Sequence, residues 1–132
     1  MILDISDMSK PKLVSHLDWS PPFPSPTHTT LPIPWKVMDR DILIVTDEEA
    51  SKLAPTPQAF FWVVDISEET NPIPIATYLV SGDGAPQDKG RFGCHQPAEQ
   101  LYDNTMYVTW FSGGLRAIDI SNPYQPKEVG YY

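Results

Sequence analysis

The chain has 132 residues, which is enough for one ordinary domain, and its hydrophobic content of 41% argues against global disorder. A net charge of −8 with nine scattered Lys and Arg residues argues against nucleic-acid binding, because phosphate contacts need clustered positive charge. Fifteen prolines leave little room for long helices, and a single cysteine excludes an intrachain disulfide and a cysteine-rich zinc site.

The first residues show no targeting segment. A signal peptide needs a basic stretch followed by an apolar core, and the opening Met-Ile-Leu-Asp-Ile-Ser has neither. No apolar run in the chain approaches the roughly 18 residues of a membrane-spanning helix. We therefore expect no membrane partner, and the cellular compartment stays open.

An Asp-Ile-Ser sequence occurs three times, beginning at Asp4, Asp65 and Asp119. Each copy is followed, seven residues after its Asp, by a proline: Pro11, Pro72 and Pro126. A repeat of this kind indicates one structural unit copied along the chain, because a single unit cannot bury its apolar faces alone.

Short apolar runs around these copies predict four strands per unit: a His-led strand, a Val-Thr strand, an Asp-Ile-Ser strand and a strand after the proline. In chain order the predicted strands are 2–5, 12–17, 28–32, 42–46, 60–64, 74–79, 95–99, 106–111, 115–118 and 127–131. Four-stranded units at this spacing are typical of propeller blades. We expect residues 1–20 to form the outer two strands of an incomplete blade, 21–80 a first complete blade, and 81–132 a loop and a second complete blade.

The repeats resemble those of the LVIVD-repeat family of β-propellers. The resemblance rests on Ile-Leu-Asp-Ile-Ser at 2–6, on Trp-Val-Val-Asp-Ile-Ser at 62–67 with Asn71-Pro72, and on Leu-Arg-Ala-Ile-Asp-Ile-Ser-Asn-Pro at 115–123 with Pro126. It implies an all-β fold: a β-propeller fragment of four-stranded antiparallel blades, about two and a half in number and incomplete. It implies no shared activity, because propellers serve as binding proteins, enzymes and scaffolds.

A propeller needs four or more blades to close, so we expect this chain to be a fragment of a longer propeller. Its partners are then the remaining blades, or other copies that associate through open blade faces and edges.

The three aspartates Asp4, Asp65 and Asp119 invite a catalytic interpretation. A carboxylate beside a Ser at a strand end commonly accepts turn N–H groups, and three equivalent positions cannot all be one active site. We therefore interpret them as structural turn residues.

His28 and His95 each open the innermost strand of a predicted blade, so their imidazoles could converge near the propeller axis. Together with Glu99, or with Glu48, they would suit a divalent first-row metal ion. The alternative is that both are repeat residues bonded to backbone carbonyls. His16 is expected on the surface.

Arg91 lies four residues before His95 and could grip a carboxylate or phosphate group; the alternative is pairing with a local Asp. The run Asp47-Glu48-Glu49 is expected to be a solvated loop. Cys94 and His95 are neighbours on a predicted strand and point to opposite faces, which argues against a nucleophile–base pair.

Two function hypotheses follow. The first is a binding or scaffold module that presents loops at one rim. The alternative is a metal-dependent enzyme of hydrolase or lyase type, in which His28, His95 and Glu99 hold a metal that activates water and Arg91 orients an acidic substrate. Whether the chain is an enzyme stays open at this point.

Overall fold

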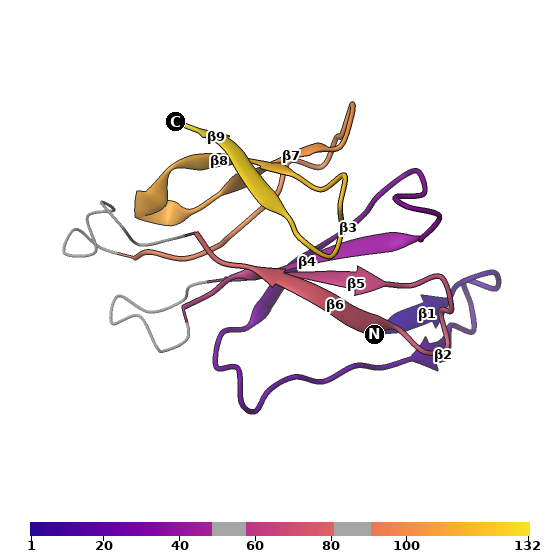
Figure 1. Ribbon diagram of the computed structural model, residues 1–132. Coiled ribbons are helices and arrows are strands. Elements are labelled where there is room, and N and C mark those ends of the chain that lie inside the picture. Colours follow the sequence, from indigo (N-terminus) through magenta and orange to yellow (C-terminus); the bar gives the residue numbers. More distant parts are fainter. Residues whose placement is uncertain (49–57, 81–90) are drawn as a thin grey trace.

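The computed structural model describes residues 1–48, 58–80 and 91–132, and in these ranges the chain is all-β apart from one 3-10 turn at Phe111–Gly113. The strands form three antiparallel sheets (Figure 1). Within each sheet the spatial order follows the sequence order, as in a meander. The sheets consist of β1 (Ile2–Asp4) and β2 (Lys12–Ser15); β3 (Thr27–Pro32), β4 (Ile42–Asp47), β5 (Phe61–Asp65) and β6 (Ile73–Tyr78); and β7 (Thr105–Thr109), β8 (Leu115–Asp119) and β9 (Lys127–Tyr131).

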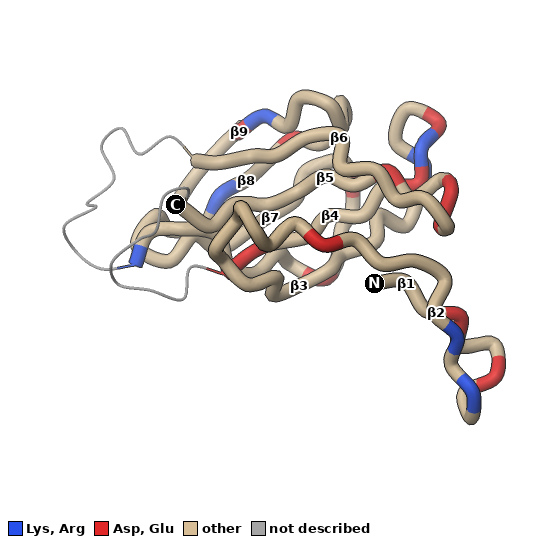
Figure 2. Tube along the Cα trace, turned by 90° about the horizontal axis from the view of Figure 1, so that it is seen from below, with Lys and Arg blue, Asp and Glu red and all other residues tan. Residues whose placement is uncertain are grey.

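These sheets confirm the expected all-β architecture and do not close into a ring within the described residues. No helix in those ranges has the length and apolarity to cross a membrane. Charged residues lie mainly in the turns at the ends of the strands (Figure 2), so the strand centres are free to pack against one another.

The third sheet differs in detail from the predicted four strands. Residues 95–98 lie along the free edge of β7 without forming a regular strand: the His95 N–H donates to the Thr109 carbonyl at 3.0 Å, and the Ala98 N–H donates to the Tyr107 carbonyl at 2.7 Å. Between them the Thr109 N–H donates to the Gln96 carbonyl at 2.9 Å, and an isolated bridge joins Pro97 and Val108. Pro97 lies opposite Val108 at a position where the neighbouring residues make the hydrogen bonds, so its missing N–H costs no bond to β7. The irregularity lies at residues 95 and 96, which both bond to Thr109.

The Asp-Ile-Ser turn has the same geometry in all three copies. One carboxylate oxygen of each Asp accepts the backbone N–H of the Ser two residues later, at 2.9, 2.9 and 2.8 Å for Asp4, Asp65 and Asp119. These bonds from Ser lower the pKa of Asp4 and Asp119. In each copy the strand pairing also shifts register at the same place, between the second and the first residue before the Asp. The three copies therefore share their local structure as well as their sequence.

The central sheet, β3–β6, packs on both faces. Toward β7–β9, the ring of Tyr78 stacks on Phe61 at 5.4 Å between centroids and meets the edge of Trp110 at 6.4 Å. On the opposite face, Trp19 stacks on Trp62 at 4.6 Å and Phe23 meets the same ring edge-on at 4.8 Å. Aromatic pairs of this geometry contribute beyond the area they bury. The segment before β3 therefore packs on one face of the central sheet, and the third sheet packs on the opposite face.

Candidate functional site

Two sheets meet where three chain segments end. His28 is the second residue of β3, Glu48 directly follows β4, and His95 begins the segment that lies along β7. Thr27 pairs with Asp47 across β3 and β4, which brings residues 28 and 48 to the same end of the central sheet. The Glu48 N–H donates to the Pro26 carbonyl at 2.8 Å and holds the backbone there. Strand pairing therefore places His28 and Glu48 together, and the contact between the second and third sheets, which includes the bond from the Cys94 N–H to the Ala59 carbonyl, brings His95 to the same junction.

At this junction His28, Glu48 and His95 each offer one ligand atom, and the three atoms lie within 4.8 Å of one another. The imidazole ring centroids are 4.4 Å apart with planes inclined by 54°, and His95 Nε2 lies 3.9 Å from Glu48 Oε1. His28 is exposed, whereas Glu48 and His95 are half-buried. Two imidazoles and one carboxylate form a donor set that first-row divalent metals accept.

Neighbouring groups orient both rings. His28 Nδ1 lies 2.7 Å from the Thr29 hydroxyl, and when it donates to that oxygen, Nε2 carries the lone pair that a metal needs. The His95 ring stacks on Phe111 at 4.9 Å with planes 24° apart. Phe111 itself begins the 3-10 turn after β7. The two imidazoles are thus held by contacts outside the cluster.

Arg91 lies at the same junction. Its Nη1 is 3.8 Å from Glu48 Oε1, and its guanidinium lies over the Phe111 ring, 5.3 Å from the centroid. The aspartates nearest to Arg91 in sequence, Asp83 and Asp88, lie outside the described residues, and within them Arg91 pairs with Glu48. An arginine in this place compensates the carboxylate charge and presents N–H donors beside the two imidazoles.

Comparison with known protein families matches the LVIVD repeat to residues 1–18, 58–80 and 100–132, which together make up more than half of the chain. The chain belongs to the LVIVD-repeat family. No curated protein and no solved structure matches it. The matched LVIVD segments contain β1–β2, β5–β6 and β7–β9. His28, Glu48, Arg91 and His95 all lie between these segments, so the LVIVD repeat supplies the scaffold but does not itself specify the cluster.

Glu99 is the predicted ligand that the structure does not bring to the cluster. It is exposed, and it follows a segment that lies extended along β7. Four residues of extended chain span roughly 13 Å, too far for Glu99 to share a metal with His95 unless the chain turns back. The carboxylate that joins the two histidines is that of Glu48 instead.

Asp47 was expected in a solvated loop and is instead the fully buried last residue of β4. Trp62 Nε1 donates to one carboxylate oxygen at 3.0 Å and the Thr27 hydroxyl donates to the other at 3.3 Å. Burial raises the pKa of this carboxyl to about 6, although both hydrogen bonds oppose the shift. No polar–apolar alternation along β4 marks this position, because five of its six residues are buried and the partners of Asp47 lie on other strands. The third member of the run, Glu49, lies outside the described residues.

Cys94 is fully buried, and its N–H donates to the Ala59 carbonyl at 3.0 Å. Burial raises the pKa of its thiol far above the ordinary value. Since the thiolate is the nucleophilic form, Cys94 is a core residue rather than a reactive partner of His95.

Proposed function

We propose that this LVIVD-repeat chain is a binding module that holds a divalent first-row transition metal ion between two of its sheets. The observation that supports the proposal is the convergence of His28, Glu48 and His95 to within 4.8 Å from three separate segments. Two of the three side chains were candidate metal ligands on sequence grounds alone, and the third was the alternative carboxylate.

The chemistry of the cluster supports a metal better than it supports a purely structural role. Three protein ligands leave at least one coordination position for an outside group. Arg91 Nη1 lies 3.8 Å from Glu48 Oε1, close enough to the cluster for its guanidinium to complement a carboxylate or phosphate ligand on the metal. An acidic small molecule or acidic side chain is therefore the class of partner that the complete site would recognise.

The metal-dependent hydrolase or lyase considered from the sequence uses these same residues. Metal binding is the step that the two hypotheses share, and no separate observation favours catalysis. The proposal is accordingly limited to binding.

Isothermal titration of the metal-free chain with Zn²⁺ and with Ni²⁺ tests the proposal. We expect one site per chain. His28→Ala, His95→Ala and Glu48→Gln should each weaken binding by roughly 100-fold or more, because loss of a direct ligand should exceed the 10- to 100-fold cost of losing an outer-shell partner.

His16→Ala and Glu99→Gln are the matched controls, since they remove the same chemical groups at exposed positions outside the cluster. Both should bind as the unsubstituted chain does. Equal weakening in the controls, or no saturable binding by the unsubstituted chain, would refute the proposed site. Near-ultraviolet circular dichroism of every variant checks that the fold is retained.

A further inference from the structure

Each sheet has two faces, and the repeat allows them to be matched between sheets. On the central sheet, Leu43, Val45 and Val64 line a cavity of about 400 Å³ together with Ile2 and Ser15 of β1–β2. We call this the leading face. Since side chains alternate along a strand, Ile42, Ile44, Phe61 and Val63 form the opposite, trailing face. The trailing face packs against β7–β9, as the contact from Tyr78 to Trp110 shows.

The third sheet uses its own leading face at that contact. Counting from the Asp of each repeat, Ile118 occupies the position of Val64, and from the Val-Thr pairs Val108 occupies the position of Val45. Met106, Val108 and Ile118 are all completely buried. The junction within the chain is therefore a trailing face of one sheet against the leading face of the next.

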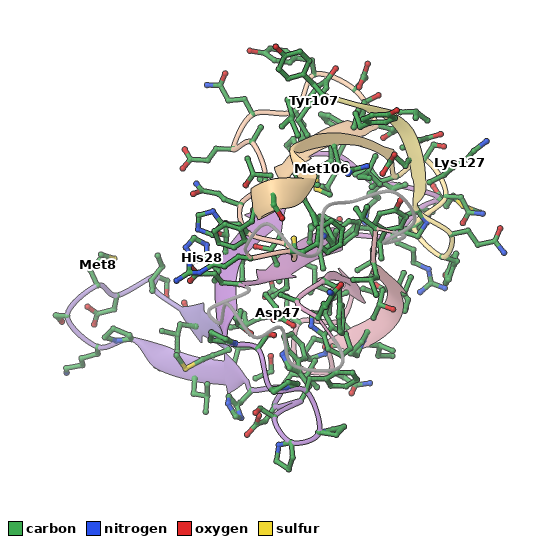
Figure 3. The ribbon with its side chains drawn as sticks, turned by 90° about the vertical axis from the view of Figure 1, so that its left-hand side faces the viewer. Met8, His28, Asp47, Met106, Tyr107 and Lys127 are labelled. Atoms are coloured by element: carbon green, nitrogen blue, oxygen red, sulfur yellow. The ribbon has the colours of Figure 1, made fainter. Side chains whose placement is uncertain are left out.

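The trailing face of the third sheet has no described segment against it. Tyr107 and Leu115 are 47% and 39% exposed, whereas Ile44 and Phe61, at the same repeat positions of the central sheet, are 0% exposed. Figure 3 places Tyr107 at the rim of the molecule and Met106 toward its middle. A groove of about 280 Å³ lies on this face between residues 95–98 and Tyr107, Thr109 and Leu115.

The leading face of β1–β2 is open in the same way. Leu3 and Ile5 are 42% and 56% exposed, although Ile118 and Ile120, which occupy the same repeat positions, are 0% and 1% exposed. Leu13, paired with Leu3 across the two strands, is also exposed. The described structure thus presents one uncovered trailing face and one uncovered leading face.

We propose that a second copy of this chain covers these faces, with the trailing face of one copy packed against the leading face of the next. The established junction between the second and third sheets is made of this same pair of faces, so an intermolecular contact would continue it. Each copy carries both halves of the interface, and neither half is covered by the part of the chain that the structure describes. Such a head-to-tail contact is heterologous, and it closes into a ring or extends into a chain according to the rotation it imposes.

Sedimentation velocity with two single-face variants tests this. Leu115→Lys places a charge on the trailing face and Leu13→Lys places one on the leading face. The unsubstituted chain should associate with rising concentration, and each variant alone should be monomeric. An equimolar mixture of the two should form a dimer, because Leu115→Lys keeps a usable leading face and Leu13→Lys a usable trailing face.

Tyr102→Lys is the control, since Tyr102 is almost fully exposed and lies outside both faces. It should associate as the unsubstituted chain does. A monomer at every concentration would overturn the proposal and assign the faces to a different partner or a further repeat. Association by both variants, or a mixture that stays monomeric, would also overturn it. Tyr107→Lys and Leu3→Lys provide second variants on each face if a first one fails to fold.

Discussion

The buried carboxyl of Asp47 carries a raised pKa because the fold removes it from water. In the unfolded chain this group titrates near its ordinary value of 3.8, and in the folded chain it titrates at about 6. Because the folded chain binds a proton at Asp47 more tightly than the unfolded chain does, protonation at low pH raises the free energy of unfolding. The gain is fully present below pH 3.8 and is lost as the pH rises through about 6.

Asp47→Asn should remove this pH dependence while keeping both hydrogen bonds. The amide oxygen can accept from Trp62 Nε1, and the amide N–H can donate to the Thr27 hydroxyl. Between about pH 4 and about pH 7, the variant should gain about 1 to 2 kcal/mol of unfolding free energy relative to the unsubstituted chain. Urea denaturation at both pH values measures the difference.

Asp18→Asn makes the same substitution at an exposed position and serves as the matched control for the change of side chain. If Asp47→Asn instead lost stability equally at both pH values, the side chain would be needed for packing and not for its proton.

At the scale of the strand and its turn, the three Asp-Ile-Ser copies are alike in hydrogen bonding but not in surroundings. Asp65 lies in the most buried copy, and its second oxygen accepts from Arg40 at 3.1 Å. Burial raises the pKa of Asp65, yet the bonds from Ser67 and the charge of Arg40 outweigh it and lower the pKa overall. Asp4 has the same turn bond at an exposed site.

Asp65→Ala should therefore cost more unfolding free energy than Asp4→Ala. We expect a loss of about 1 to 3 kcal/mol for Asp65, because its removal leaves a turn N–H and a guanidinium without their partner. A lowered pKa gives stability above 3.8 that is lost as the pH falls, so the cost should shrink in acid. Denaturation of the two variants at neutral and acidic pH measures this, and equal costs at neutral pH would contradict it.

The repeat spacing predicted the elements well because strands, turns and prolines are local features. It correctly assigned the Val-Thr and Asp-Ile-Ser strands and the strands after the prolines. It was less successful at 95–98, where His95 and Gln96 both bond to Thr109 and no regular strand forms, and at Asp47, whose burial depends on the chain packed over β4. The choice between Glu48 and Glu99 could not be made from spacing, because the partner of His95 is set by which strand ends meet across two sheets.

For the molecule as a whole, the proposed metal site lies across a boundary between sheets. His28 and Glu48 belong to the end of the central sheet, whereas His95 belongs to the segment bonded to β7. Further contacts at this boundary include the Tyr78–Trp110 pair, the bond from the Cys94 N–H to the Ala59 carbonyl at 3.0 Å, and the bond from Trp35 Nε1 to Asn104 at 2.9 Å. A bound ion would add a direct link between the second and third sheets.

Metal binding should consequently raise the melting temperature of the chain. A ligand that binds only the folded state raises the free energy of unfolding by about 2.7 kcal/mol when its concentration is 100 times the dissociation constant. Scanning calorimetry with Zn²⁺ should show this increase in the unsubstituted chain and in Glu99→Gln. The His95→Ala variant should lose this increase, because it retains only two of the three ligands, His28 and Glu48, and both of these belong to the central sheet. Hydrogen exchange adds a local readout: the His95 and Thr109 amides, which pair residues 95–96 with β7, should exchange more slowly with metal bound. An undiminished rise in His95→Ala would place the ion on the central sheet alone and contradict a link between sheets.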